Sequence, residues 1–464
     1  MLLAAATLAA FLMPFMGSAV NVALPTISAA FSMSALSVTW VASAFLLAAA
    51  MVLVPAGRLA DLIGRKKIFL TGAVIFAAGS LACIGSPNQG VFIALRAVQG
   101  VGAAMTFGTG TAMLISAYPP EIRGKILGIN IAGVYIGLTI GPFVGGMLVQ
   151  HLGWESIFIF TALLGALVAA LAMGIGTQPD AAASGEVFDW PGAALYAVAL
   201  FSLMYGFSVL PSLAAAVWIA AGVAGLVFFV RQQSMNPFPL INIRLFKANR
   251  VFAFSNLAAL INYCATFAIT FILSLFLQHV KMLTPLQAGM VLVVEPLLQA
   301  LFSPLAGRLS DRYEPRVIAS IGMMLTVIGL ISLTWMQADT PLAQVVTSLA
   351  VLGVGFAFFS SPNVNAIMSS VENRYYGVAS ATLATMRMLG QMLSMGIAML
   401  VFAVIIGDQS LSVKTGGKLI SSGRLIFGIL AVICIFGIFA SLARGRMHER
   451  SPGIPGDDYE NSGS

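Results

Sequence analysis

Long apolar segments separated by short polar ones fill this 464-residue chain from end to end. Most of them are about 20 residues long or longer, which is the length that an α-helix needs to cross the hydrocarbon core of a membrane. The pattern therefore predicts an all-α integral membrane protein. Fourteen spans are expected, at about 4–30, 36–57, 67–86, 89–117, 125–150, 156–177, 191–210, 212–230, 251–279, 285–307, 317–337, 341–370, 377–406 and 425–443.

A short motif at the end of the second span returns later in the chain. Residues 57–61 read Gly-Arg-Leu-Ala-Asp, and residues 307–311 read Gly-Arg-Leu-Ser-Asp. A second marker, Gly-Val-Gly, stands at 100–102 and again at 353–355, with nearly the same offset. Two markers that repeat in the same order at a common spacing indicate a duplicated unit of about half the chain. Such duplications are typical of membrane transporters, in which the substrate binds between the related halves.

The positions of the repeat set the expected domain organisation. The first copy follows span 2 and the second follows span 10, so the second half should begin at span 9, with spans 7 and 8 inserted between the halves. We expect a first six-helix bundle at 1–177 and an inserted pair with its flanking loops at 178–250. A second six-helix bundle is expected at 251–443, followed by a disordered cytoplasmic tail at 444–464, which is polar and rich in Gly, Pro and Ser.

Composition places the chain in a membrane. It is 59% hydrophobic and only 8% charged, whereas a soluble protein carries roughly a quarter charged residues. The net charge of +7 could suggest a nucleic-acid partner, but most lysines and arginines fall in alternate loops. With the N-terminus inside, the outer loops hold only Lys281, Lys414, Lys418 and Arg424. By the positive-inside rule we expect both termini in the cytoplasm, a cytoplasmic (inner) membrane location and no nucleic-acid partner.

Several kinds of chemistry have no motif in the sequence. No Walker-type Gly-x-x-x-x-Gly-Lys-[Ser/Thr] loop is present, so ATP drive within the chain is not expected. No His/Cys cluster has the spacing of metal ligands, and no large extramembrane segment could house an active site. We therefore expect no enzyme activity, no bound metal and no cofactor.

The loop after span 2 carries the first candidate functional residues, which are Gly57, Asp61, Gly64 and Arg65. Gly64 permits a tight turn. Asp61 can accept hydrogen bonds from the N-terminus of a neighbouring helix or pair with a basic residue. Such a contact must break when the two halves rock, so we expect a conformational latch, with Asp311 as its weaker counterpart. The alternative is a basic loop with an incidental aspartate.

Three charged residues lie deep inside the predicted spans: Arg96, Glu295 and Arg387. An ionised side chain at mid-bilayer costs about 2.5–3.5 kcal/mol on insertion scales, so such residues are rarely without a function. Counting along their spans puts Glu295 and Arg387 at similar depth, which makes an ion pair between them conceivable. A carboxylate that alternates between an apolar environment and an arginine can take up and release a proton. Glu295 is therefore either a proton carrier or one partner of a static ion pair.

Four stretches resemble the major facilitator superfamily, and specifically its fourteen-span drug:proton antiporter family of multidrug efflux type. Besides the loop after span 2, residues 95–104 in span 4 resemble the arginine motif of that family, and residues 18–25 resemble its first-span signature. The fourth stretch resembles the antiporter motif in span 5, with Gly137, Gly141, Pro142, Gly145 and Gly146. Glycines at four-residue steps share one helical face and let two backbones approach closely. Ordinary helix packing is the alternative interpretation of that face.

The resemblance covers essentially the whole chain and implies the major facilitator fold, with a role for Arg96 in proton transfer. One departure from the family pattern matters. The first-span signature usually has an acidic residue where this chain has Met16. Because Glu295 is the remaining acid deep in a span, we assign proton coupling to Glu295, Arg387 and Arg96.

Other polar side chains within spans could line a substrate path. For each of them a hydrogen bond between helices is the expected alternative. The candidates are Asn21, Tyr135, Asn262, Asn363 and Gln391.

The sequence thus predicts a proton-coupled secondary transporter that exports amphipathic or cationic organic compounds by alternating access. Its expected partners are a small organic substrate, protons and the lipid bilayer, and it is expected to be a monomer. One alternative is an exporter of a specific metabolite, lipid or antibiotic. Another is a receptor or scaffold that no longer transports, although the retained motifs favour transport.

The predicted topology can be tested with single cysteines at the chain end and in the last outer loop. A membrane-impermeant thiol reagent should reach Thr415→Cys from outside, whereas Ser464→Cys should react only from the cytoplasmic side. Labelling of Ser464→Cys exclusively from outside would overturn the predicted orientation.

Overall fold

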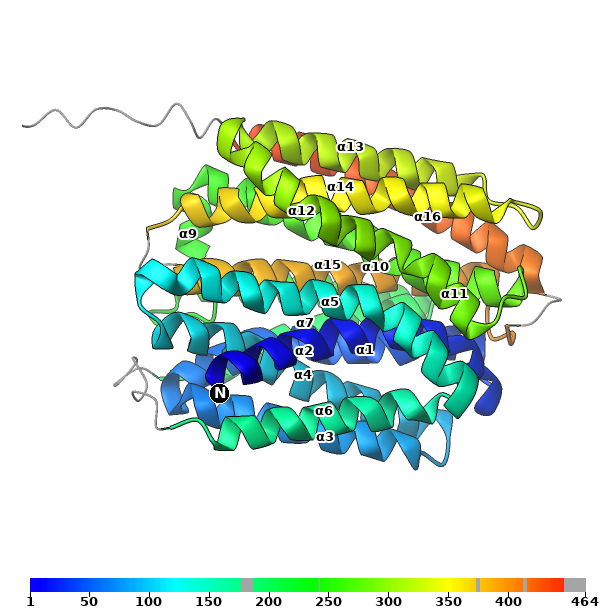
Figure 1. The fold of residues 1–464 in the computed structure, drawn as a ribbon, viewed down its shortest axis with the longest axis horizontal. Helices are drawn as coiled ribbons and strands as arrows, with labels where there is room; N and C mark the ends of the chain where they lie inside the picture. Colours follow the sequence, from blue (N-terminus) through cyan, green and yellow to red (C-terminus); the bar gives the residue numbers. More distant parts are fainter. Residues whose placement is uncertain (177–186, 242, 373–375, 412–414, 446–464) are drawn as a thin grey trace, which may run out of the picture.

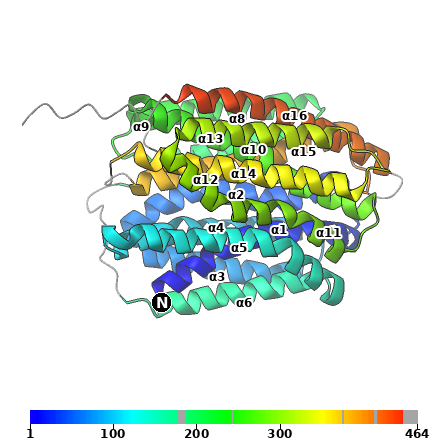
Figure 2. The ribbon, with the colours of Figure 1, turned by 45° about the horizontal axis from the view of Figure 1, so that its top comes forward.

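The structure is a computed structural model. Its helices run side by side along one direction (Figures 1 and 2). It describes residues 1–176, 187–241, 243–372, 376–411 and 415–445. Within these ranges one isolated β-bridge joins Ser34 and Ser410. The predicted disordered tail, from 446 onward, and residues 177–186 of the linker before span 7 lie outside the described residues.

We name three sets of helices. The first bundle comprises α1 (Leu2–Ala30), α2 (Ala35–Ile63), α3 (Arg65–Ile84), α4 (Gln89–Ala117), α5 (Pro120–Leu152) and α6 (Glu155–Met173). The inserted pair is α7 (Trp190–Ser208) and α8 (Leu213–Met235), followed by the short α9 (Ile243–Ala248). The second bundle comprises α10 (Arg250–His279), α11 (Pro285–Leu292), α12 (Val294–Arg312), α13 (Pro315–Thr334), α14 (Leu342–Ser369), α15 (Tyr376–Ile405) and α16 (Gly416–Ala443).

The predicted number of spans is confirmed. Within the described residues, 14 helices are long and apolar enough to cross a membrane, α11 and α12 counting together as one span over Pro285–Arg312. Their bounds agree with the sequence-based ones to a few residues except at the last span, which was expected from 425 but begins at Gly416. Its first turns contain Lys418 and Arg424, which lower the hydropathy. Arg424 Nε donates to the carbonyl oxygen of Thr334 at 2.7 Å, so this polar segment is helical at the edge of the span.

The two bundles repeat the same pattern of helix neighbours. In the first bundle α1 packs against α5, α2 against α4, and α3 against α4 and α6. In the second bundle α10 packs against α15, α12 against α14, and α13 against α14 and α16. The contacts between the bundles are equivalent too, because α2 lies against α15 and α5 lies against α11. This is the arrangement that a duplicated unit produces.

The inserted pair lies at one of these seams between bundles. α7 and α8 pack against each other, and α7 also contacts α2 and α15. Met204 and Phe207 of α7 fill the space beside Gly396 of α15. Large apolar side chains of α8, such as Val217 and Phe228, are exposed, as expected for a surface that faces lipid. We propose that the pair accompanies the two bundles without forming part of either.

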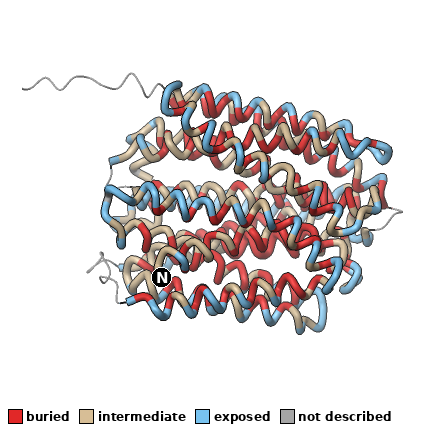
Figure 3. Tube along the Cα trace, viewed as in Figure 1, coloured by how far each residue is buried: buried red, intermediate tan, exposed pale blue. Residues whose placement is uncertain are grey.

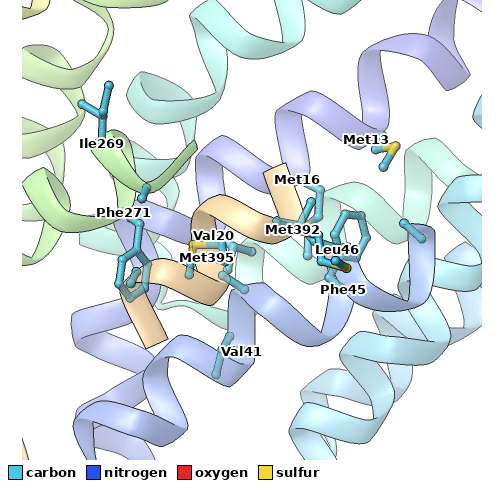
Figure 4. Packing of buried hydrophobic residues seen from close by; sticks show 14 of the residues in the cluster. Met13, Met16, Val20, Val41, Phe45, Leu46, Ile269, Phe271, Met392 and Met395 are labelled. Atoms are coloured by element: carbon cyan, nitrogen blue, oxygen red, sulfur yellow. The ribbon is translucent and has the colours of Figure 1, made fainter. Parts of the chain in front are cut away.

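Buried residues concentrate on the faces that helices turn toward one another, while the outer faces and loops are exposed (Figure 3). Where α1, α2 and α15 meet, the buried side chains are apolar and rich in methionine (Figure 4). Met16 and Val20 of α1 lie there beside Phe45 of α2 and Met392 and Met395 of α15. We call this group the apolar layer. Its apolar side chains join the two bundles.

The glycine face predicted in span 5 packs α5 against α1. A Cβ atom added to Gly137 would lie 2.5 Å from the carbonyl oxygen of Phe11, and one added to Gly145 would lie 2.8 Å from the Cα atom of Ala19. Gly141 approaches α1 in the same way. Since these distances are too short for a real side chain, the face brings two helix backbones into direct contact.

We expect Gly137→Ala to lower the thermal unfolding midpoint of the detergent-solubilised protein. The added methyl group overlaps a backbone oxygen of α1, and overpacking typically costs about 1–3 kcal/mol. Gly128→Ala is the matched control, since it lies in the same helix with no atom within 4 Å of the added Cβ. It should leave the midpoint unchanged or raise it, because alanine favours helix by about 1 kcal/mol over glycine. Equal midpoints for the two variants would contradict the packing role.

Candidate functional site

The loop between α2 and α3 forms an ion pair inside the first bundle. Nη2 of Arg65 lies 2.8 Å from Oδ1 of Asp61, and Nε of Arg65 donates to the same oxygen at 2.8 Å. Nη1 of Arg65 also donates to the carbonyl oxygen of Ala112 in α4. Gly64 adopts a φ of +109°, which a residue with a side chain rarely adopts and which allows the turn between the helices. Within the described residues, Asp61 contacts the first bundle and not the second.

The second copy of this motif is held differently. Asp311 is exposed at the end of α12 and makes no hydrogen bond or ion pair with the described residues. Ser310, which replaces Ala60 of the first copy, accepts a hydrogen bond from Nδ2 of Asn365 in α14 at 2.9 Å. The first copy therefore holds its loop through charge, and the second copy through a neutral hydrogen bond.

Arg96 is buried inside the first bundle, against the helix α2 that forms one seam with the second bundle. It is 1% exposed and lies in α4. Its Nε donates to the carbonyl oxygen of Val41 in α2 at 3.2 Å, and its Nη1 donates to Oε1 of Gln99. The guanidinium carbon lies 4.6 Å from the ring centroid of Phe45. Neutral groups thus satisfy this charge, and no carboxylate pairs with it in the described part of the chain.

Glu295 stands at a break in its span. α11 ends at Leu292 and α12 begins at Val294. Pro296 has no N–H to donate to the carbonyl oxygen of Leu292, which explains the interruption. Glu295 lies in the first turn of α12 and is partly buried. Its carboxylate forms no hydrogen bond or ion pair with any described residue. The first turn of a helix favours a negative charge, since the helix dipole is positive there.

The conceivable ion pair between Glu295 and Arg387 is absent, although both residues are described. Their depths explain why. At about 1.5 Å per residue, Arg387 lies about 16 Å from the start of α15 at Tyr376. Glu295 lies about 26 Å from the end of α12 at Arg312, which is the same end of the molecule. The expectation of similar depth was wrong because both positions were counted from the N-terminal ends of their spans, and these two ends lie at opposite ends of the molecule.

Arg387 belongs instead to a group of aromatic and hydroxyl side chains between the bundles. Its guanidinium carbon lies 5.0 Å from the ring centroid of Tyr263 in α10. Tyr135 of α5, in the first bundle, lies in the neighbourhood of Tyr263. The hydroxyl oxygen of Tyr135 lies 3.4 Å from Oγ of Ser360 in α14. We call these four residues, together with Gln391 one turn beyond Arg387, the central cluster.

The remaining polar candidates have mixed surroundings. Asn363 joins helices, because its Nδ2 donates to the carbonyl oxygen of Ser255 at 3.1 Å. Oδ1 of Asn21 and Nδ2 of Asn262 are buried and have no hydrogen-bond partner among the described residues. Gln391 is partly exposed and has no such partner. The structure therefore shows Asn363 as a link between helices of the second bundle. The unpartnered groups of Asn21, Asn262 and Gln391 remain candidates for contact with a substrate.

One polar network escaped the sequence analysis. Arg444, expected in the polar tail, is 1% exposed at the end of α16. Its Nη1 donates to Oδ1 of Asn363 and Oγ of Ser255, and its Nη2 to Oγ of Ser441. Burial lowers the pKa of Arg444 to about 10, the neighbouring Arg316 adding to this effect. An arginine just after an apolar run looks in sequence like a topological signal, so no local pattern could have revealed this role.

Hydrogen bonds between the bundles gather at one end of the molecule. We call the end that carries the α2–α3 loop, with Arg65, Lys66 and Lys67, the basic end. At the opposite end, Oε1 of Gln150 accepts from the backbone N–H of Leu286. Further bonds there join Gln278 to Val22, Ser274 to Asn21 and Ala35 to Gln409. These described hydrogen bonds therefore close the seam at the end opposite the basic end.

Glycines complete this closure. A Cβ atom added to Gly146 of α5 would lie 2.5 Å from the carbonyl oxygen of Pro285 in α11. One added to Gly289 of α11 would collide with the carbonyl oxygen of Pro142 in α5. The antiporter-like motif thus has two faces, one against α1 and one against the second bundle. Gly289 was not singled out in the sequence, where a lone glycine in a span carries no distinctive signal.

Comparison with known proteins agrees with this architecture. A family model described as Major Facilitator Superfamily matches residues 6–395 and 255–459. The chain is 30% identical over 436 residues to the riboflavin transporter RibZ of Clostridioides difficile (strain 630), covering 94% of this chain and 95% of that protein. It is 30% identical over 386 residues to the methylenomycin A resistance protein of Bacillus subtilis (strain 168), with 82% of each covered. It is 27% identical over 396 residues to the tetracenomycin C resistance and export protein of Streptomyces glaucescens, covering 84% and 73%.

Solved structures show the same fold. A bacterial homolog of the human lysosomal transporter Spinster, in an inward-facing and unoccupied conformation, matches with a TM-score of 0.68 at 17% identity, covering 96% of both chains. The nucleoside transporter NupG matches with a TM-score of 0.65 at 16% identity, covering 96% of this chain and all of that one. With fourteen predicted spans, a repeated pattern of helix contacts and this family match, the chain is a multi-pass membrane protein that belongs to the major facilitator superfamily and is similar to its drug-export members.

Proposed function

We propose that the protein is a proton-coupled secondary transporter that exports amphipathic organic compounds across the cytoplasmic membrane. The basic end would face the cytoplasm, in keeping with the positive-inside rule. The repeated helix contacts support two moving units, α1–α6 and α10–α16, which rock about the α2–α15 and α5–α11 seams. A monomer contains both units, and we propose no catalytic step.

Alternating access would exchange the contacts at the two ends of the seam. In the present conformation the bonds of Gln150 and Gln278 close the end that we assign to the outside. Opening that end would break them, and closing the basic end would bring the loop of Asp61 toward the second bundle. The ion pair between Asp61 and Arg65 would then have to rearrange, which is how the loop would favour one conformation.

One observation carries the proton-coupling proposal: Glu295 is a carboxylate at a helix break within a span, with no hydrogen bond or ion pair to the described residues. An ionised group at such a depth is costly, by about 2.5–3.5 kcal/mol on insertion scales, and protonation removes that cost. Breaks in transporter helices commonly form ion and substrate sites. Glu295 would take up a proton from the outer side and release it toward the cytoplasm. Arg96 would stabilise the first bundle through its hydrogen bonds to Val41 and Gln99.

A second function in the same class is supported by the comparison with RibZ, which covers more of this chain than the drug-resistance relatives do. A transporter of one aromatic metabolite would have a narrow specificity. The two functions are separated by measuring how strongly a panel of unrelated amphipathic compounds, and riboflavin, inhibit transport by the protein. Inhibition by many members of the panel supports drug efflux, whereas inhibition by riboflavin alone supports the metabolite transporter.

Asp61→Asn should slow transport at least about fivefold, a change typical of coupling between conformations, with little loss of folded protein. The pair of Asp61 with Arg65 is partly exposed, so removing its charge should cost less than about 1 kcal/mol of stability. Asp311→Asn is the matched comparison and should have a milder effect, since Asp311 makes no ion pair here. Transport in inverted vesicles and protein yield are the measurements. A normal rate and normal conformer populations for Asp61→Asn would refute the latch.

Glu295→Gln should abolish accumulation of substrate driven by a pH gradient. Glutamine keeps the size of the side chain but cannot change charge, so the variant should still bind substrate and could equilibrate it. Uptake into inverted vesicles with and without an imposed pH gradient is the measurement. Met16→Asp, which restores the acid of the family pattern, is the second variant and should partly rescue coupling. Proton-driven uptake by Glu295→Gln at the wild-type rate would assign the carrier role elsewhere.

A further inference from the structure

The central cluster brings a lone cation and two aromatic rings together between the bundles. Arg387 comes from α15, Tyr263 from α10 and Tyr135 from α5, so both bundles contribute. All three side chains are partly exposed although they lie well inside their spans. The group therefore lies where a transported compound would have to pass if the bundles rock as proposed.

Arg387 differs from the two fully buried arginines, Arg96 and Arg444. Arg96 donates to Val41 and Gln99, and Arg444 donates to side chains on neighbouring helices. Arg387 makes no hydrogen bond or ion pair with any described residue, and its described partner is the face of the Tyr263 ring. A guanidinium has five N–H donors in a flat fork, and they remain unused here.

The unused fork has a definite chemical complement. A guanidinium binds a carboxylate or another oxygen-rich edge with two parallel hydrogen bonds, and these charge-assisted bonds are stronger than neutral ones. Because the guanidinium carbon of Arg387 lies over the Tyr263 ring, a ligand bound to the fork lies close to that ring. Tyrosine rings beside it offer stacking partners for a flat ligand.

We propose that the central cluster is a substrate site for planar aromatic compounds with an anionic or acidic-carbonyl edge, an inference that rests on the proposed transport function. The edge binds Arg387, and the aromatic body lies against Tyr263 and Tyr135. Cationic compounds meet a like charge there and are disfavoured. Glu295, the acid that could attract a cation, is about 10 Å further along the span axis at about 1.5 Å rise per residue.

Two xanthene dyes of opposite charge test this proposal: fluorescein, an anion at mildly alkaline pH, and the cation tetramethylrhodamine methyl ester. Binding to the full-length protein in lipid nanodiscs is measured by fluorescence anisotropy. The wild type should bind fluorescein more tightly than the rhodamine ester. Arg387→Gln should weaken fluorescein binding roughly ten- to a hundredfold, the loss expected for charged hydrogen bonds, without weakening the rhodamine ester. The fluorescein affinity of Arg387→Lys should lie between those of the wild type and Arg387→Gln, since lysine keeps the charge but lacks the fork.

Controls separate this result from general loss of charge or of fold. Arg424→Gln removes a cation from the edge of span 14, a span that contributes no residue to the central cluster. It should leave the affinities for fluorescein and for the rhodamine ester unchanged. Tyr263→Phe keeps the ring and should bind fluorescein nearly as well as wild type, whereas Tyr263→Leu should not. Tighter wild-type binding of the rhodamine ester overturns the proposal even if no variant folds. An unchanged ratio of the two affinities in folded Arg387→Gln overturns it as well.

The outcome is distinguishable from failure of the proposed function. Fluorescein binding that depends on Arg387, without any flux in vesicles under a pH gradient, supports the site and contradicts proton-coupled transport. Flux of the rhodamine ester driven by a pH gradient, at a rate that Arg387→Gln does not change, supports the transport function and overturns the site.

Discussion

Helices in a membrane gain little from burying apolar surface, because lipid is as apolar as their own side chains, so close backbone contact has to hold a bundle together. Glycine supplies that contact at equivalent places in the two bundles. A Cβ atom added to Gly100 would collide with the carbonyl oxygen of Phe45 in α2, and one added to Gly353 with that of Glu295 in α12. The repeated Gly-Val-Gly marker therefore reflects a packing requirement that both bundles share.

This equivalence aligns the bundles residue by residue and exposes their difference in charge. Glu295 stands where the first bundle has Phe45, and Leu349 stands where it has Arg96. At these equivalent positions the first bundle thus has a buried cation and the second a partly buried anion, and neither has a described partner of opposite charge. Arg96 is stabilised by fixed amide and carbonyl groups and by the ring of Phe45. Among the described residues Glu295 has no such hydrogen-bond partners, so we propose that a proton stabilises it in the apolar state.

The sequence predicted whatever depends on local composition. Spans follow from hydropathy, the duplication from repeated motifs, and the glycine face of span 5 from four-residue spacing, and the structure contains all three. That this face packs against α1 was not predicted. Relations between distant segments were out of reach. Depth within the bilayer depends on where each helix starts, so the spacing of Glu295 and Arg387 was misjudged. Burial of Arg444 depends on oxygens supplied by two other helices, α10 and α14, as well as by its own helix, which no single stretch of sequence reveals.

The break at Val293 connects the proposed proton site with the seam between bundles. On one side of it Gly289 of α11 holds the α5 backbone at Pro142, and on the other side Glu295 begins α12. The glycine contact consists of packed backbone atoms, so opening it leaves no buried hydrogen-bond partner stranded. A change in the charge of Glu295 acts within two helical turns of that contact, and the missing hydrogen bond at Pro296 makes the segment easier to bend. If Glu295 carries the proton, the same short segment that binds it also controls whether the outer seam is closed.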